Sequence, residues 1–354
     1  MNGSHIPSAT RNQQLVTLIQ DVLECKDIGS FRKKVEDIMK YYDNYSGEKI
    51  SFNDYRSLRE DLRQAYDSRT LERGLYYIRR LKKSLEEWRD NGINDINLNR
   101  WKDYDDIITD SLWNFRRRDS SGSHLAWYWG NFIPQIPRQL ILRYTKKGDW
   151  VLDPFAGSGT TIIESLRLGR KCLGVELNED TVRKARGMIG NALEGTEWYL
   201  ISGDSTSMDF KKLLEERKIQ DVSLIILHPP YHDIIKFSND PRDLSAAKSL
   251  KEFILGFSKV LSNVRPVLRK ERYLAVVAGD KYSKGEWIPI GFKLMEETAK
   301  HGFKLVSIVV KNYEDTRAKR GQLELWRYRA LLGGFYVFKH EYIFIFKKSG
   351  ADRV

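Results

Sequence analysis

The stretch VLDPFAGSGTT, residues 151–161, decides how this chain folds. Apolar residues lead into Asp153, a glycine-rich turn follows at residues 157–159, and residues 160–164 open a helical segment. Glycines let the backbone come close to a ligand, and the free N–H groups at the start of a helix attract an anionic group. The run matches neither GxGxxG nor GxxxxGK[ST], so a site for nucleotide phosphates is disfavoured.

Seven short β-rich runs, separated by helical segments, extend from this stretch to the C-terminal end of the chain. Such alternation predicts a mainly parallel sheet covered by helices. The segment before the last run is basic, aromatic and broken by glycines, which predicts an inserted loop with a short helix and an antiparallel C-terminal strand. The runs are WVL (150–152), KCLGVE (171–176), EWYLIS (197–202), VSLIIL (222–227), YLAVVAG (273–279), KLVSIVV (304–310) and EYIFIF (341–346).

Composition narrows the class of protein. The 354 residues, 41% of them apolar, are enough for one large domain and a smaller one, and a disordered or fibrous chain is disfavoured. No run has the apolar length of a membrane span and the start is polar, so we expect an intracellular, cytoplasmic protein. Cys25 and Cys172 stand in no cysteine or histidine cluster, so we expect neither a disulfide nor a metal site. The net charge of +12 favours a polyanionic partner.

The first third of the chain has a different pattern, rich in charge and helical in period. Apolar residues recur every three or four positions over residues 71–88, and residues 31–45 form a second amphipathic segment. The small polar stretch DSSGSH, residues 119–124, is typical of a linker. We therefore expect a helical domain over residues 1–118, with charged faces that are either solvated or in contact with nucleic acid, and an α/β domain over residues 119–354.

Acidic residues end the two predicted strands that follow the glycine-rich turn. Glu176, in GVELNED, stands where a carboxylate can accept hydrogen bonds from ribose hydroxyls, and Asp204, in ISGDS, where one can receive an adenine amino group. Each alone could be a helix cap or a loop carboxylate. With Asp153 they place three acids at successive strand ends, which fits a ligand with a ribose, an adenine and an amino-acid-like end.

A second marked stretch is LIILHPPYHDII, residues 224–235, in which an apolar strand runs into His228-Pro229-Pro230-Tyr231. Two consecutive prolines fix the backbone and remove N–H donors, so that nearby carbonyls can face a ligand. The tyrosine offers a flat face on which a base can stack. A neutral imidazole can accept a hydrogen bond. The alternative is that His228 merely ends the strand and that the Pro229 carbonyl is the acceptor.

These stretches resemble the motifs of the amino-methyltransferases of DNA, specific for adenine N6 or cytosine N4, which use S-adenosyl-L-methionine. DPFAGSGTT resembles the first motif, GVELNED and ISGDS the next two, and HPPY the (D/N/S)PPY motif, from which it departs by its histidine. GNFIPQIPRQLILRY, residues 130–144, resembles the segment that packs against the methionine end of the cofactor. The resemblance extends over residues 120–348 and implies a Rossmann-like methyltransferase sheet. It implies cofactor contacts at Phe132, Pro134, Asp153, Phe155, Ala156, Gly157, Ser158, Gly159, Thr160, Thr161, Glu176, Leu177, Asp204 and Ser205.

The resemblance also implies an activity: methylation of an exocyclic amino group in double-stranded DNA, in a restriction–modification or related system with a partner endonuclease. In this family the residue at the position of His228 and a proline carbonyl accept hydrogen bonds from the target amino group, and the residue at Tyr231 holds the base flipped out of the duplex. Methylation of cytosine C5 is disfavoured, because it needs a cysteine nucleophile and neither cysteine follows a proline. Two alternatives stay open: a tRNA guanine-N2 methyltransferase, and a non-catalytic DNA-binding relative.

Three parts of the chain are candidates for the element that reads the DNA sequence. They are the loop 232–248, the N-terminal helices and the basic, aromatic segment 311–336. Basic side chains there can contact phosphates or guanine edges, or can simply be solvated. In the last segment the candidate contacts are Lys311, Arg317, Lys319, Arg320, Arg327 and Arg329.

Overall fold

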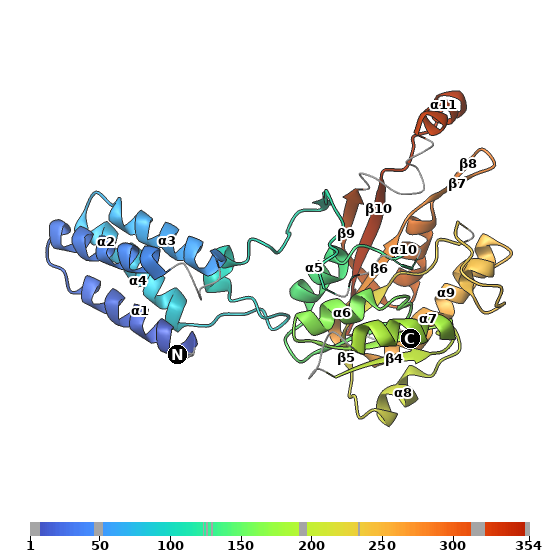
Figure 1. Cartoon of the computed structure of the whole chain (residues 1–354), viewed down its shortest axis with the longest axis horizontal. Coiled ribbons are helices and arrows are strands. Elements are labelled where there is room, and N and C mark those ends of the chain that lie inside the picture. The colour runs from blue at the N-terminus through green and yellow to red at the C-terminus, as the bar shows by residue number, and fades with distance from the viewer. Residues whose placement is uncertain are drawn as a thin grey trace. The chain divides into compact units, whose positions relative to one another are not determined.

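The structure is a computed structural model that describes residues 8–45, 52–122, 124, 127–128, 130–190, 197–232, 234–312 and 323–350. The chain divides into two compact units, Met1–Ile107 and Ile108–Val354 (Figure 1). The boundary falls before the expected one, because strand β1, Leu112–Trp113, pairs with β9, Phe303–Asn312, and so belongs to the second unit. None of the described helices is long and apolar enough to cross a membrane.

The first unit is helical. Residues at helical spacing, among them Ile19, Phe31, Ile78 and Leu81, are buried in its core. Thr70 begins the last of its α-helices by accepting a hydrogen bond from the N–H of Arg73, which satisfies one of the donors at the helix start. The helices are α1 Ser8–Leu23, α2 Ile28–Tyr45, α3 Phe52–Tyr66, α4 Leu71–Glu86 and the 3-10 helix η1 Leu98–Asp103.

The second unit contains every strand that the sequence predicts. The short helix predicted before the last strand is also present, as α11, Leu323–Gly333. The further strands are β2 Trp150–Asp153, β3 Lys171–Glu176, β4 Trp198–Ser202, β5 Val222–Leu227, β6 Leu268–Ala278, β10 His340–Lys348 and the hairpin pair β7 Lys281–Ser283 and β8 Glu286–Ile288. The further helices are α5 Gln135–Tyr144, α6 Thr160–Arg167, α7 Glu179–Gly190, α8 Phe210–Glu216, α9 Leu250–Val264, α10 Ile290–Lys300 and the 3-10 helices η2 Leu244–Ala246 and η3 Arg265–Val267.

The main sheet has the strand order β1-β9-β10-β6-β5-β2-β3-β4. β10 pairs antiparallel with β6 and β9, whereas the other neighbouring pairs of this sheet are parallel. Both the mainly parallel sheet and its antiparallel C-terminal strand are therefore confirmed, and with them the Rossmann-like fold class.

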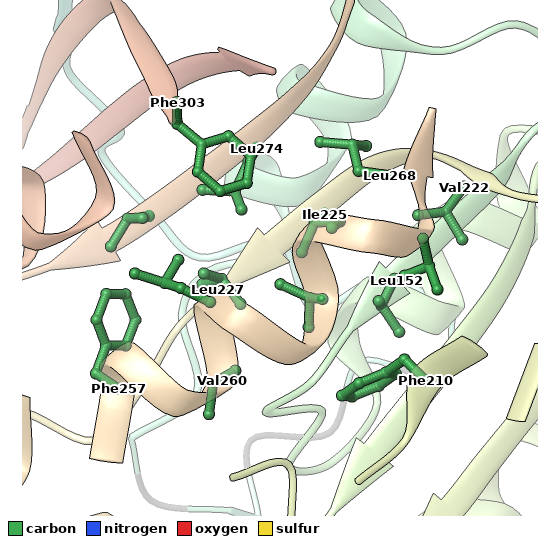
Figure 2. Close-up of a cluster of buried hydrophobic side chains, with 14 of the residues drawn as sticks. Leu152, Phe210, Val222, Ile225, Leu227, Phe257, Val260, Leu268, Leu274 and Phe303 are labelled. Atoms are coloured by element: carbon green, nitrogen blue, oxygen red, sulfur yellow. The ribbon is translucent and has the colours of Figure 1, made fainter. Parts of the chain in front are cut away.

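The core of the second unit lies where α8, α9 and α10 cover one face of this sheet. Alternate residues of β5, such as Ile225 and Leu227, point to that face, as the period of a strand requires (Figure 2). Phe257 and Val260 of α9 lie near Leu227, and Phe210 of α8 belongs to the same cluster and lies beside Leu152 of β2. Helices α5 and α6 pack against each other and contact β5 and β3 respectively.

Strand β2 is the point at which the strand order reverses, since β3 and β4 follow on one side of it and β5 and β6 on the other. In open α/β sheets ligands bind beyond the carboxyl ends of the strands at such a point. The glycine-rich turn leaves β2 and the HPPY stretch leaves β5. The fold therefore brings the two marked stretches to the same edge of the sheet.

Candidate active site

One pocket at this edge is lined by residues from the turn after β2, the ends of β3 and β4, and the HPPY stretch after β5. The sequence predicts many of these residues from separate motifs, and the fold gathers them around one space. The predicted residues in the lining are Phe132, Phe155, Ala156, Gly157, Glu176, Leu177, Asp204, Ser205, His228, Pro229, Pro230 and Tyr231.

The other predicted cofactor residues lie behind this lining. Asp153 is 1% exposed, and its carboxylate accepts hydrogen bonds from the N–H of Phe155 at 3.0 Å and from Oγ1 of Thr161 at 2.5 Å. Burial raises the pKa of Asp153 to about 6. Its carboxyl therefore ties the turn to α6 and does not reach the pocket surface. Pro134 precedes α5, Ser158 and Gly159 complete the turn, and Thr160 and Thr161 are buried in the first turn of α6.

The turn after β2 needs its glycines for conformation and for space. Gly157 and Gly159 have φ values of +50° and +82°, in the region that residues with a Cβ adopt at a cost. A Cβ at Gly157 would lie 3.0 Å from the ring of Tyr128, and one at Gly159 would lie 2.5 Å from Cδ1 of Ile189. The side chains of Tyr128 and Ile189 thus leave no room for a side chain at either glycine.

Glu176 joins the turn to the end of β3. Its Oε2 accepts the N–H of Gly157 at 3.0 Å, and its Oε1 accepts the N–H of Asn178 at 2.9 Å. Burial raises the pKa of Glu176, and the two backbone hydrogen bonds lower it again in part. Because each carboxylate oxygen can accept more than one hydrogen bond, Glu176 keeps acceptor capacity toward the pocket that it lines.

Asp204 organises the loop after β4. Its Oδ1 accepts the N–H of Thr206 at 2.8 Å, and Oγ1 of Thr206 and Oγ of Ser207 also donate to its carboxylate. Next to it, Oγ of Ser205 donates to the carbonyl of Pro154 at 2.8 Å, which ties this loop to the turn after β2.

His228 is the first member of a chain of polar contacts that leads away from the pocket. Its Nε2 lies 3.0 Å from the hydroxyl of Tyr231, which donates to Oε2 of Glu341 at 2.9 Å. Oε1 of Glu341 pairs with Nζ of Lys311 at 3.0 Å. The ring of Phe132 packs edge-to-face on His228, with centroids 4.7 Å apart. Burial lowers the pKa of His228 to about 4, so the imidazole is neutral at physiological pH.

The placement of Lys311 corrects one prediction made from the sequence. The prediction that Lys311 contacts DNA was wrong. Lys311 is 4% exposed, because it lies opposite Glu341 in the pairing of β9 with β10 and forms a buried ion pair with it. Arg327 and Arg329 lie exposed on α11, where contact with DNA stays a prediction. The candidates Arg317, Lys319 and Arg320 lie outside the described residues.

Sequence reasoning missed the wall of the pocket that faces the turn. Tyr128 and Phe237 stack there, with ring centroids 5.7 Å apart and planes at 17°. Burial raises the pKa of Tyr128. Asn131 donates to Oγ of Ser158, and Arg242 also lines the pocket. The aromatic residues before GNF were the available signal for Tyr128, whereas nothing local pointed from Phe237 to the glycine turn.

A mainly parallel sheet of this order, with a glycine-rich turn and a buried acidic residue at its switch point, is typical of Rossmann-like methyltransferases. The sequence model of the DNA methylase family, which covers the N6 and N4 enzymes, matches residues 13–187 and 222–353. The chain belongs to this family. The match begins at residue 13, so it includes most of the helical unit, beyond the extent of the resemblance found in the sequence.

Type II methyltransferases are among the relatives of this chain. M.Cfr9I of Citrobacter freundii is 39% identical over 91 residues, 26% of this chain and 28% of that protein. M.SmaI of Serratia marcescens is 38% identical over 79 residues, 22% of this chain and 26% of that protein. The matched stretches thus span about a quarter of each relative's length. A probable tRNA (guanine(10)-N2)-dimethyltransferase of Methanothermococcus thermolithotrophicus is 27% identical over 173 residues, 48% of this chain and 91% of that protein.

Solved structures show similarity at a lower level. A methyltransferase from Pyrococcus furiosus has a TM-score of 0.39 at 16% identity, over 62% of this chain and 84% of its own. TrmN from Thermus thermophilus also has a TM-score of 0.39, at 18% identity, over 61% of this chain and 49% of its own. The fold class stands on the sheet order and the family match.

Family membership identifies S-adenosyl-L-methionine as the cofactor, and the described residues fit it. Gly157 lines the pocket without a side chain, so a ligand can come close to the backbone of the turn. Glu176 offers acceptors for a diol, and Phe132 gives the pocket an apolar surface. The acids of the lining suit the hydroxyl and amino donors of an adenosine.

Proposed function

We propose that this protein transfers the methyl group of S-adenosyl-L-methionine to the exocyclic amino group of adenine (N6) or cytosine (N4) in double-stranded DNA. The observation that carries the proposal is the meeting of the glycine-rich turn at Gly157 with the HPPY stretch in one pocket at the switch point of the sheet. Membership in the DNA methylase family and the net charge of +12 support DNA as the substrate.

The cofactor would lie across the ends of β2, β3 and β4. Glu176 would accept its ribose hydroxyls, Asp204 would receive its adenine amino group, and Phe132 would pack beside its methionine end. S-adenosyl-L-methionine supplies a sulfonium methyl group: the N–C bond forms as the C–S bond breaks with its electron pair kept by sulfur, and the methylated nitrogen loses one proton to water. The residues of the chain hold the two reactants in line and supply hydrogen-bond acceptors.

The HPPY stretch would hold the target base. His228 and the carbonyl of Pro229 would accept hydrogen bonds from the target amino group, which orients its nitrogen toward the methyl group. Tyr231 would face the ring of a base that has left the duplex stack. The lowered pKa of His228, about 4, supports this role, because a neutral imidazole has an acceptor nitrogen and a protonated one has none.

Methylation of guanine N2 in tRNA is the second candidate, favoured by the match that spans 91% of the tRNA dimethyltransferase relative. Transfer of tritium from labelled S-adenosyl-L-methionine to genomic DNA and to total tRNA separates the two. We expect label in DNA amino groups and its loss in His228→Ala. Label in tRNA alone would replace the proposal by the second candidate, and no label in either would leave a non-catalytic DNA-binding relative.

We also propose that the protein acts on cytoplasmic DNA beside a partner endonuclease, as the type II relatives suggest. The exposed Arg327 and Arg329 of α11 would contact phosphates. Replacing both with alanine should reduce the slope of log affinity against log salt by about 2, because each phosphate contact contributes about 0.9. An unchanged slope would remove α11 from the DNA interface.

A further inference from the structure

We propose that Glu341 and Lys311 are positioning residues that hold His228 in the tautomer whose Nδ1 accepts a hydrogen bond from the target amino group. Neither residue lies in the stretches that resemble motifs of the family, and the two lie on β10 and β9. The inference rests on the proposed methyl transfer. The chain of contacts from Lys311 through Glu341 and Tyr231 to His228, called the relay below, would let a histidine stand where the (D/N/S)PPY pattern has a residue with an oxygen acceptor.

The direction of the hydrogen bonds follows from what each group can donate. The ammonium of Lys311 has no acceptor, so it donates to Oε1 of Glu341. The hydroxyl of Tyr231 donates its one hydrogen to Oε2 of Glu341. Its oxygen must then accept at the 3.0 Å contact with His228, so Nε2 of His228 carries the proton. In a neutral ring this leaves Nδ1 without a hydrogen.

Packing fixes the groups of this relay. Lys311 and Glu341 are directly opposite each other in the pairing of β9 with β10, and their exposed fractions are 4% and 3%. The ring of Tyr231 lies against Gly279, where a Cβ would come within 3.0 Å of it. Among the described residues Nδ1 of His228 has no hydrogen-bond partner, and His228 lines the pocket. The acceptor nitrogen is therefore left for a ligand.

A buried ion pair is costly, because two charges lose their hydration, and a pair of apolar side chains would often stabilise the two strands as well. The hydrogen bond from Tyr231 to Glu341 gives the ion pair a role beyond stability, which is to orient the hydroxyl of Tyr231. An aspartate, asparagine or serine at position 228 has an oxygen acceptor whatever its neighbours do. A histidine can accept only if the proton is kept on its other nitrogen, and Glu341 keeps it there.

The variant Glu341→Gln should reverse the relay. Lys311 can only donate, so it takes the amide oxygen, and the amide N–H₂ faces Tyr231. The hydroxyl of Tyr231 then donates to Nε2 of His228, and the ring proton moves to Nδ1. Nitrogen NMR of the histidine-labelled protein at neutral pH reads the two tautomers directly, with the His228 signals assigned by their absence in His228→Asn. Tyr231→Phe, which removes the link but keeps the ring, should give a mixture of both tautomers.

Kinetics give the second readout. We expect Glu341→Gln to lower the single-turnover methylation rate at least tenfold in the wild-type background and less than about threefold in His228→Asn, whose amide oxygen needs no relay. Lys347→Gln is the control: Lys347 lies on β10, the strand of Glu341, and pairs with Glu271 of β6 outside the relay, so the rate of this variant should be unchanged.

A proton on Nδ1 in the wild-type protein would overturn the proposal, and so would an equal loss of rate in both backgrounds. If His228→Asn is inactive, the NMR result decides. The NMR measurement needs no methyl acceptor, so an absence of methyl transfer would refute the proposed function and leave the tautomer question answered separately.

Discussion

Replacing Asp153 with asparagine distinguishes a carboxylate that contacts the cofactor from one that holds the turn. Asp153 is buried, with hydrogen bonds from Phe155 and Thr161, and burial raises its pKa from 3.8 to about 6. Asparagine keeps an oxygen that can accept the N–H of Phe155 and an amide that can donate to Oγ1 of Thr161. It removes the charge and retains the geometry.

The size of the effect follows from the pKa shift. A shift from 3.8 to about 6 corresponds to about 3 kcal/mol, at 1.36 kcal/mol per pKa unit. The folded state favours the protonated form of Asp153. The contribution of this preference to the stability of the folded protein is fully present below pH 3.8 and is lost as the pH rises through about 6. Asparagine does not titrate. The free energy of unfolding of Asp153→Asn minus that of the wild type should therefore rise by about 3 kcal/mol between about pH 4 and pH 7.

Urea unfolding followed by tryptophan fluorescence at several pH values measures this difference, and calorimetry measures cofactor affinity. We expect Asp153→Asn to bind S-adenosyl-L-methionine within about threefold of wild type. Asp153→Ala should bind it at least tenfold more weakly, because two buried donors lose their acceptor at about 1–3 kcal/mol each. A stability difference that does not change with pH would refute the raised pKa. Equal loss of affinity in both variants would refute the turn-holding role in favour of direct contact through the charge.

Three further outcomes follow from the pocket. Gly157→Ala should lower the free energy of unfolding by about 1–2 kcal/mol, because of its positive φ, and weaken cofactor binding, which denaturation and calorimetry would show. Glu176→Gln should weaken cofactor binding about tenfold or more, and Asp204→Asn by less, and the reverse order in titrations would contradict the geometry. With the pKa of His228 lowered to about 4, His228 should not titrate in the methylation rate between about pH 5.5 and 8, so the pH profiles of wild type and His228→Asn should have the same shape there. An acid limb near 6.5 that His228→Asn abolishes would contradict this.

Most of the α/β sheet could be predicted because each strand has a local signal. VSLIIL and EYIFIF are short apolar runs with clear ends, and strands β5 and β10 cover the same residues within two positions. The glycine-rich turn was equally readable, since its conformation demands glycine locally. The two-residue strand β1 could not be predicted, because its partner Val310 lies far along the chain and no pattern within Leu112–Trp113 indicates the pairing.

The ion pair of Lys311 with Glu341 shows why the rest of the site could not be predicted. In the sequence Lys311 begins a basic segment, and basic residues in such segments usually face solvent. Its burial depends on the register of two strands separated by an insertion, and that register places a carboxylate opposite it. The charge environment of Lys311 is set by residues that are close in space but far away in the sequence, so the sequence around Lys311 does not reveal it.

The three acids at successive strand ends look alike in the sequence, yet the donors around each give them different capacities. Asp153 receives one donor on each oxygen, as Glu176 does, but it is 1% exposed and does not line the pocket, so its remaining acceptor positions do not face a ligand there. Asp204 lines the pocket but already receives the N–H and hydroxyl of Thr206 and the hydroxyl of Ser207. Glu176 receives one backbone N–H on each oxygen, and a carboxylate has about four acceptor positions. Glu176 therefore has the most capacity left for a ligand, which is why its substitution should cost the most affinity.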